Sequence, residues 1–460
     1  MAAQEKRKSL QGLWSSRLVF ILAVSGSAVG LGNIWKFPYI AGDNGGGAFV
    51  LVYLVCVFTI GLPIMMSEIL IGRRGRRNPI MTMKIVGEEE AGQSWWQIVG
   101  ISGVLAGFLI LSFYSVVAGW ALAYIFKSAT GTFHGIDGPG VEKVFGDLTG
   151  NWQILMMWHT LFMLMTVGVV ARGVQRGLEQ AVRVLMPALV GLLLILFVYA
   201  INHGAFVEAL NFMFRADFDR LTADSVLVAL GHAFFTLSLG MGAVMAYGAY
   251  LPEGTSILST SIAVVFADTI IALLAGMVIF PIVFAHGLDA GQGPGLIFQT
   301  LPLAFGQMTG GVIFGTMFFV LLSFAAWTSS IGLIEPAVAW LTERFHMQRP
   351  QAAWLVGGIT WVLGVGSVLS FNLLADFKIW RPGKDPGTIF DSLDHLASNL
   401  MLPLGGLLIA VFAGWVMCQN ATSEELDIGD GGIYKLWRFL TRVVAPAMVL
   451  LIFLRGVGLI

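Results

Sequence analysis

Residues 25–38 of the chain read SGSAVGLGNIWKFP. They lie in the middle of the first long apolar run, residues 17–40, where a membrane-spanning helix is normally uninterrupted. Glycine and proline disfavour the interior of a helix, and asparagine and lysine are costly to place in a bilayer. The stretch therefore predicts a spanning helix that breaks near its midpoint.

The rest of the composition agrees with a membrane protein. Of 460 residues, 57% are hydrophobic and only 12% are charged, which is too apolar for a soluble domain of this length. A span needs about 20 predominantly apolar residues. The sequence predicts an all-α polytopic membrane protein with about eleven spans, in the runs 17–40, 46–71, 96–126, 151–171, 179–201, 224–250, 258–285, 310–343, 351–371, 390–418 and 437–458.

The charged residues and cysteines limit the partners. A net charge of −1 disfavours a nucleic-acid partner, so the bilayer and a small substrate are the partners expected. Cys56 and Cys418 lie in apolar runs and predict no disulfide framework. No nucleophile or metal-ligand cluster accompanies the buried acids, and we do not expect an enzyme.

Lysine and arginine predict the orientation of the chain. Most of the 26 basic residues fall in the segments that share a side with the N-terminus, for example at residues 73–77. By the positive-inside rule, this side is cytoplasmic. We expect a multi-pass protein of the cell's inner (plasma) membrane, with the C-terminus outside.

The sixth apolar run carries a second interruption, TLSLGMGAVMAYG at 236–248. Glycine-broken helices at matching places in two halves indicate a binding site at the midplane of an inverted-repeat transporter. Either break alone is better explained by close helix packing, since small residues let helices approach and Gly26 and Gly30 form a GxxxG pair. The matching positions of the two breaks, with Asn33 and Lys36 nearby, favour the binding site.

A few polar groups lie within the spans, and each needs a partner because burying a charge costs at least about 2.5–3.5 kcal/mol. They are Lys36, Glu68, Asp268, Glu335 and Asp394, with the neutral His232 and Asn33. We expect Glu68 and Glu335 to satisfy backbone groups that the broken helices expose. Lys36 and Asp394 form either a gate or a static surface ion pair.

Several oxygen-bearing side chains near the breaks suit a hard cation such as sodium. They are Asn33, Thr236, Asp268, Thr328 and Ser329. They predict one sodium site or two. For Thr328 and Ser329 an alternative is hydrogen bonding back to their own helix, as spanning serines and threonines commonly do.

The chain resembles the neurotransmitter:sodium symporter family, particularly its prokaryotic amino-acid transporters, over nearly its whole length. The resemblance is carried by SAVGLGNIWKFPYIAGDNGGGAF, FYSVVAGW, FFTLSLGMGAVMAYGAY and TSSIGLIEP. It implies a five-plus-five inverted repeat with helices 1 and 6 broken, the LeuT-like fold, plus one further helix.

The same resemblance implies how the chain is divided. Residues 1–16 would be a cytoplasmic segment, and 17–418 the transport core, with repeats at 17–201 and 224–418. Residues 419–436 would form a cytoplasmic loop, and 437–460 the eleventh helix with a short C-terminus. Segment 286–309, which mixes glycine, proline and an amphipathic stretch, is expected to form a lid.

Carried over position by position, the resemblance implies two sodium ions. The first would lie among Ala28, Asn33, Thr236 and Asp268, and the second among Gly26, Val29, Ala325, Thr328 and Ser329. The family often has asparagine at position 268 and places chloride beside it. Because Asp268 supplies that negative charge itself, we expect no chloride requirement.

The implied substrate site lies between the breaks. Leu31 and Gly32 N–H groups and the Tyr114 hydroxyl would hold a carboxylate, for which Gly30 leaves room. Carbonyls near Ala28, Phe235, Thr236 and Ser238 would face an ammonium group. The side-chain pocket would be lined by Ser27, Ile110, Phe235, Met241, Ser330 and Leu333, with Ser329 also at the site.

The resemblance also implies gates and a hinge. Lys36, where the family commonly has arginine, and Asp394 would close the outer side, and Glu343 and Tyr250 the inner side. Gln11 stands where an inner arginine is expected, so Arg7 or Lys8 becomes the predicted partner of Glu343. Gly177 and Pro187 would let helix 5 unwind.

The function predicted is sodium-coupled import of hydrophobic and aromatic L-amino acids, such as tryptophan, phenylalanine and leucine, by alternating access. Met241 is flexible enough to accommodate side chains of different size. The alternatives are an amino-acid-binding sensor or channel without concentrative transport, and a symporter of biogenic amines. Amine-selective relatives usually carry aspartate at the position of Gly30, which disfavours the amine alternative.

Overall fold

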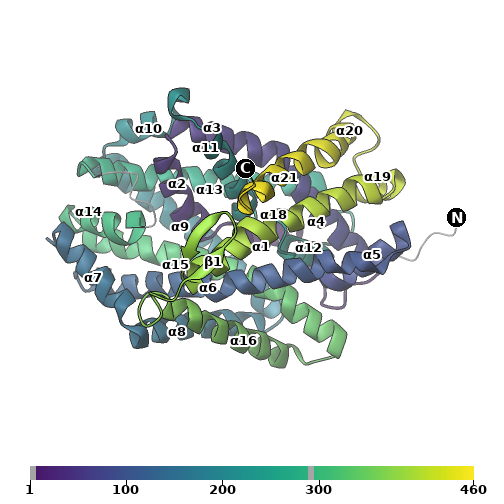
Figure 1. Ribbon diagram of the computed structural model, residues 1–460, viewed down its shortest axis with the longest axis horizontal. Coiled ribbons are helices and arrows are strands. Elements are labelled where there is room, and N and C mark those ends of the chain that lie inside the picture. The colour runs from purple at the N-terminus through teal and green to yellow at the C-terminus, as the bar shows by residue number, and fades with distance from the viewer. Residues whose placement is uncertain (1–6, 289–294, 460) are drawn as a thin grey trace.

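The computed structural model describes residues 7–288 and 295–459, and the molecule is a bundle of helices (Figure 1). In these ranges nine helices are long and apolar enough to cross a membrane, and the pair α1 and α2 passes the same test as one bent span. A shorter apolar helix, α11, is followed after a break by α12. Each apolar run of the sequence thus corresponds to a helix or a broken pair.

We number the spans in chain order, with η marking 3-10 or π-helical turns. They are span 1 (α1 Arg17–Ala28, η1 Gly32–Lys36, α2 Phe37–Asp43), span 2 (α3 Gly47–Cys56, η2 Val57–Gly61, α4 Leu62–Gly75), span 3 (η3 Ser94–Trp96, α6 Gln97–Ala129), span 4 (α8 Trp152–Val170), span 5 (η4 Val174–Leu178, α9 Glu179–His203), span 6 (α11 Ala223–Thr236, α12 Ala243–Ala249), span 7 (α13 Ile257–Ala285), span 8 (α15 Gly311–Phe345), span 9 (α16 Arg349–Leu369), span 10 (α17 Ile389–Asp394, η7 His395–Met401, α18 Leu402–Val411, η8 Phe412–Val416) and span 11 (α20 Gly432–Phe439, η9 Leu440–Val444, α21 Ala445–Gly456).

Short elements connect the spans. They are α5 Pro79–Ala91, α7 Gly138–Gly150, α10 Phe206–Phe214, η5 Phe218–Arg220, η6 Leu296–Thr300, α14 Leu301–Gln307, β1 Ile379–Arg381, β2 Lys384–Gly387 and α19 Gln419–Leu426. The two strands pair antiparallel, with Arg381 opposite Lys384. In Figure 1 the N-terminus, α5 and α19 lie toward one end of the molecule, and α7 and α14 toward the other.

The connection between spans 10 and 11 differs from the sequence expectation. Residues 419–436 contain helix α19, and span 11 begins at Gly432. The sequence did not predict a start at Gly432, because Lys435 and Arg438 interrupt the apolar run. Lys435 is exposed, whereas Arg438 lies one turn after the buried Tyr434 and donates to its hydroxyl at 2.7 Å.

Small residues let spans 2 and 6 pack backbone to backbone. A Cβ at Gly72 would lie 2.0 Å from the carbonyl oxygen of Met245, and one at Gly248 would lie 2.8 Å from that of Ile69. A larger side chain at either position would push the helices apart. Spans 2 and 6 are therefore joined as a single packed unit on the N-terminal side.

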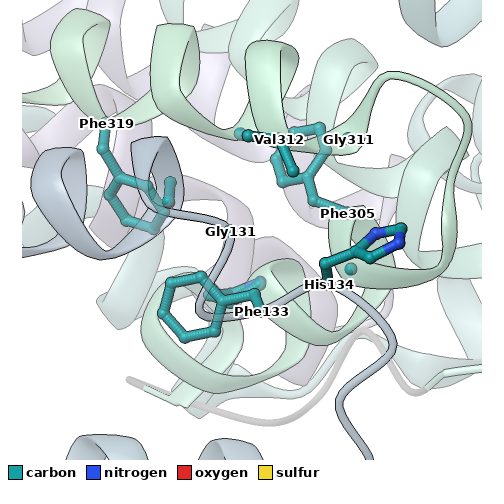
Figure 2. A pocket seen from close by; sticks show the side chains of 11 residues that line it. Gly131, Phe133, His134, Phe305, Gly311, Val312 and Phe319 are labelled. Atoms are coloured by element: carbon teal, nitrogen blue, oxygen red, sulfur yellow. The ribbon is translucent and has the colours of Figure 1, made fainter.

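The expected lid, segment 286–309, contains η6 and α14; its residues 289–294 lie outside the described residues. The lid rests on the loop that follows α6, where the N–H of Gly135 donates to the carbonyl of Gly306 at 2.9 Å. Figure 2 shows Phe133 and His134 of that loop facing Phe305 across a small, mainly apolar pocket. This pocket is separate from the cavity between the helix breaks.

Candidate functional site

Span 1 breaks where the sequence predicts. α1 ends at Ala28, Val29 is extended, and the two parts of the span differ in direction by 51°. Gly30 is required at the break, because a Cβ there would lie 2.7 Å from the Tyr114 hydroxyl and 2.9 Å from the Cβ of Ser329. The backbone of span 1 thus directly contacts spans 3 and 8.

Span 6 breaks between Thr236 and Ala243. Ser238, Gly240 and Gly242 all have positive φ angles, which end the helix and expose backbone groups. One of these, the N–H of Gly240, donates to Glu68 Oε1 at 2.7 Å. The prediction that Glu68 satisfies the backbone of a broken helix is confirmed.

A buried polar cluster joins the two breaks to span 7. Asn33 Nδ2 donates to Asp268 Oδ1 at 2.8 Å, and Thr236 Oγ1 donates to the two carboxylate oxygens at 3.2 and 3.1 Å. All three side chains are fully buried. The structure thus brings together the three side chains predicted for the first sodium site, next to Ala28 at the end of α1.

Two aromatic residues beside this cluster were missed by the sequence analysis. Tyr53 of span 2 lies next to Asp268, and its ring contacts the buried His232 of span 6 with ring centroids 5.5 Å apart. Phe37 stacks on the same histidine and also contacts Tyr53, with ring centroids 5.8 and 5.1 Å apart. Tyr53 gave no signal because it sits in an ordinary apolar run, where tyrosine is a common packing residue.

The residues predicted for the second sodium site lie where spans 1 and 8 cross. A Cβ at Gly26 would lie 3.4 Å from the Cβ of Thr328. Thr328 Oγ1 donates to the carbonyls of Phe324 and Ala325 in its own helix, each at 3.1 Å, as the alternative interpretation expects. Ser329 instead reaches across to span 1, because its Oγ donates to the Ser27 carbonyl at 3.0 Å.

A narrow, nearly filled cavity lies between the breaks. All of the residues that line it are predicted ones: Ala28, Gly30, Gly32, Ile110, Tyr114, Phe235, Ser238, Met241, Ser329 and Leu333. At one end Leu31 N–H points to the Tyr114 hydroxyl at 3.1 Å. The cavity is polar at the break of span 1 and apolar opposite it.

Two predicted wall residues face away from this cavity. Ser330 Oγ contacts Thr166 Oγ1 at 2.8 Å and donates to the Trp327 carbonyl, so it joins span 8 to span 4. The side chain of Ser27 packs against Gly332, where a Cβ would lie 2.1 Å from its Oγ. Only the carbonyl of Ser27 is directed toward the region of Ser238 and Ser329.

On the side away from the N-terminus, the cavity is closed by Phe235 and a charged pair. Lys36 Nζ lies 4.3 Å above the centre of the Phe235 ring and 3.9 Å from Asp394 Oδ1. Lys36 and Asp394 therefore meet over the cavity, as expected. Both remain partly exposed, with 21% and 35% of their side-chain surfaces accessible.

On the N-terminal side, the closure is deeper and uses an unexpected arginine. Tyr250 donates to Glu335 Oε1 at 3.0 Å, and Arg349 at the start of span 9 forms an ion pair with the same carboxylate. Arg349 also donates to Gln11 at 3.1 Å. Glu335 thus binds side chains rather than exposed backbone, and the sequence expectation for it is wrong.

Glu343 also has a different partner from the one expected. It accepts hydrogen bonds from the backbone and side-chain nitrogens of Asn78, at 2.8 and 2.7 Å. Arg7 pairs with Glu89 instead, and Lys8 contributes only its carbonyl, to Arg77. The proposal that Arg7 or Lys8 would neutralise Glu343 is therefore wrong, because α5 begins beside it and offers Asn78.

The predicted hinge of span 5 lies next to the N-terminal segment. Gly177 is in the π-helical turn η4, and Pro187 is inside α9. Between them Glu179 accepts hydrogen bonds from Ser15 Oγ at 2.5 Å and from Arg183 at 2.6 Å. These hydrogen bonds join the N-terminal segment to span 5 between Gly177 and Pro187, where the proline weakens the helix.

Two broken spans, a buried oxygen cluster between them and a closed cavity at their centre define an ion-coupled transporter of the inverted-repeat class. Comparison with known proteins agrees. The model of the sodium:neurotransmitter symporter family matches residues 11–135 and 141–459. The chain therefore belongs to this family of sodium-dependent symporters, and it has the LeuT-like fold with its five-plus-five inverted repeat.

Individual relatives match over almost the whole chain. It is 37% identical over 450 residues to the sodium-dependent transporter YhdH of Bacillus subtilis, covering 97% of this chain and 98% of that one. A sodium-dependent transporter of Haemophilus influenzae is 34% identical, covering 96% and 97%. The crystal structure of MhsT in complex with L-phenylalanine superposes with a TM-score of 0.89 at 43% identity, covering 97% of this chain and 99% of MhsT.

Proposed function

We propose that the chain imports hydrophobic and aromatic L-amino acids together with two sodium ions, without chloride, by alternating access. The observation that carries this proposal is the buried Asp268 carboxylate, held by Asn33 and Thr236 beside the cavity. An uncompensated carboxylate in a bilayer is costly. A sodium ion bound at this oxygen cluster supplies the missing positive charge.

Coupling follows from the position of this cluster beside Gly30 and Tyr114. A substrate carboxylate placed at the break of span 1 becomes a further ligand of the first sodium. Each then strengthens the binding of the other, because such linkage is reciprocal. A sodium gradient directed inward drives accumulation of the amino acid.

The proposed substrate class rests on the walls of the cavity. Ile110, Met241 and Leu333 form an apolar region, and Phe235 covers it. The relative MhsT, at 43% identity, was crystallised with L-phenylalanine. Amine-selective relatives usually carry an aspartate at the position of Gly30. This chain has no room for that aspartate, because its Cβ would collide with Tyr114 and Ser329, and a biogenic amine is therefore disfavoured.

The remaining assignments complete the proposal. The first sodium takes Ala28, Asn33, Thr236 and Asp268, and the second takes Gly26, Val29, Ala325, Thr328 and Ser329. Lys36 and Asp394 form the outer gate, Tyr250 and Glu343 belong to the inner closure, and Gly177 and Pro187 to the hinge. The N-terminal side is cytoplasmic in a plasma membrane, and the transport core is 17–418, with repeats 17–201 and 224–418.

The test is uptake of radiolabelled phenylalanine, tryptophan and leucine into proteoliposomes. Sodium is replaced by potassium in one arm and chloride by gluconate in another. Accumulation that requires sodium but not chloride supports the proposal. Sodium-dependent binding without accumulation supports the sensor instead, and a chloride requirement contradicts the role of Asp268.

A single variant tests the proposed role of Asp268 as a sodium ligand. We expect Asp268→Asn to raise the sodium concentration needed for half-maximal uptake by at least about tenfold. This is the scale of one lost charged interaction. Asp376→Asn removes an exposed carboxylate and is the matched control. An unchanged sodium dependence in Asp268→Asn would exclude this residue as a sodium ligand.

A further inference from the structure

A basic groove lies on the surface of spans 10 and 11, separate from the transport cavity. It is lined by Trp415, Lys435, Arg438, Phe439, Arg442 and Val443. The groove is on the same side of the molecule as the N-terminus, because the neighbouring α19 is joined to span 2 there through Arg73 and Glu425. None of these residues takes part in the sites described above.

The three basic residues form one stripe along span 11. Positions 435, 438 and 442 are three and four residues apart, which places them on one face of a helix. Seven residues correspond to about 10 Å along the helix axis. The stripe therefore runs from the end of the span, at Lys435, into the depth of the membrane at Arg442.

The positive charges of the groove are not neutralised by the protein. Among the described residues, no carboxylate lies within 4.0 Å of any of the three. Within the described ranges, Arg438 donates to the hydroxyls of Tyr434 and Thr422, and the buried Nε of Arg442 has no hydrogen-bond partner.

The groove also has an apolar wall. The guanidinium of Arg442 stacks on the Trp415 ring at 4.3 Å, and Trp415 Nε1 donates to the Arg442 carbonyl at 2.9 Å, which fixes the ring. The outer surfaces of Trp415, Phe439 and Val443 remain exposed, Trp415 to 59%. Such a combination suits a ligand with an anionic head and an apolar tail.

We propose that this groove binds the headgroup phosphate of an anionic phospholipid. Lys435, Arg438 and Arg442 contact the phosphate, and Trp415, Phe439 and Val443 contact the acyl chains. A basic pocket beside a spanning helix attracts anionic headgroups by about 1 kcal/mol for each lysine or arginine. The phosphate also compensates the charge of Arg442, which lies ten residues into span 11, where an unpaired charge is costly.

The test uses the full-length chain, purified in detergent and stripped of lipid. Binding of phosphatidylglycerol is titrated by native mass spectrometry, with phosphatidylcholine and inorganic phosphate as competitors. We expect each of the variants Lys435→Gln and Arg442→Gln to weaken binding about fivefold, and the double variant about twenty-five-fold. Lys84→Gln removes a basic residue from α5, outside the groove, and is the matched control.

Trp415→Leu provides a second measurement that leaves all three charges in place. We expect it to weaken phosphatidylglycerol binding while the protein remains folded. The proposal is overturned if the double variant binds as the wild type does, or if Lys84→Gln loses as much. It is also overturned if phosphatidylcholine competes equally, or if millimolar inorganic phosphate displaces the lipid, which would indicate a site for a free anion.

Discussion

The two sides of the central cavity are closed in different ways. On the side away from the N-terminus, which we propose to be the outer side, the Phe235 ring is covered by the pair Lys36 and Asp394, whose charged atoms are 3.9 Å apart and partly exposed. On the N-terminal side, which we propose to be the inner side, Glu335 is fully buried between Tyr250 and Arg349, whose side chain is only 13% exposed. The outer closure thus keeps contact with solvent, and the inner closure is buried.

This difference teaches which side opens more easily. Exposed ion pairs contribute about 0–1 kcal/mol, whereas breaking a buried pair by removing one partner costs about 3–5 kcal/mol. The proposed outer side is therefore expected to open for less energy than the proposed inner side.

The largest effect expected from breaking this asymmetry is that of Glu335→Gln. It leaves Arg349 charged and without its carboxylate, which favours opening of the N-terminal side by about 3–5 kcal/mol, or roughly 150- to 4,000-fold. We expect amide hydrogen exchange in residues 11–28 to accelerate strongly and uptake to be lost. Arg344→Gln, on the exposed end of the same helix, should leave both unchanged; protected amides in Glu335→Gln would contradict a closure held by this pair.

Gln11→Ala should have an intermediate effect. It removes the hydrogen bonds from Arg349 and to Thr342, which are 3.1 and 2.7 Å long. Their loss corresponds to about 1–2 kcal/mol, or roughly 5- to 30-fold faster amide exchange in the same segment. Gln175→Ala, which removes an exposed hydrogen bond to the Leu13 carbonyl, should show little change. Equal effects of the two variants would mean that Gln11 has no special place in the inner closure.

Lys36→Met should have the smallest effect. The pair with Asp394 is partly exposed and contributes about 0–1 kcal/mol, and the contact with the Phe235 ring adds about 0.5–1 kcal/mol. We expect bound phenylalanine to dissociate about fivefold faster, measured with radiolabelled substrate in detergent. Lys36→Arg keeps both contacts and serves as the control. If Lys36→Met disturbs the protein as strongly as Glu335→Gln, the proposed asymmetry between the two sides is wrong.

The sequence predicted the breaks and the cluster around Asp268 because glycine, asparagine and aspartate are unfavourable inside apolar runs and seldom occur there without a specific role. It did not predict Arg349, which looks like one more basic residue on the N-terminal side. Only the packing of spans 8 and 9 brings this arginine to Glu335. Long-range partners of this kind leave no local pattern.

Helix geometry explains why only one of the two adjacent serines of span 8 that were predicted at the substrate site lines the cavity. Ser329 and Leu333 are one turn apart and both line the cavity, whereas Ser330 is rotated by about 100° and contacts Thr166. Adjacent residues of a straight helix cannot both face a narrow cavity. Spacing from Leu333 does not decide between them, because residues three and four apart both share a helix face.

Gly30 has a consequence for how this transporter can change over evolution or in the laboratory. Its position admits no Cβ until both Tyr114 and Ser329 move, because that atom would lie 2.7 Å from the Tyr114 hydroxyl and 2.9 Å from the Ser329 Cβ. Under the proposed function, a switch to amine substrates that relies on an aspartate there cannot start with that substitution alone, because it would displace span 1 from spans 3 and 8. Room at both 114 and 329 must come first, so the order of mutations is constrained before their number is.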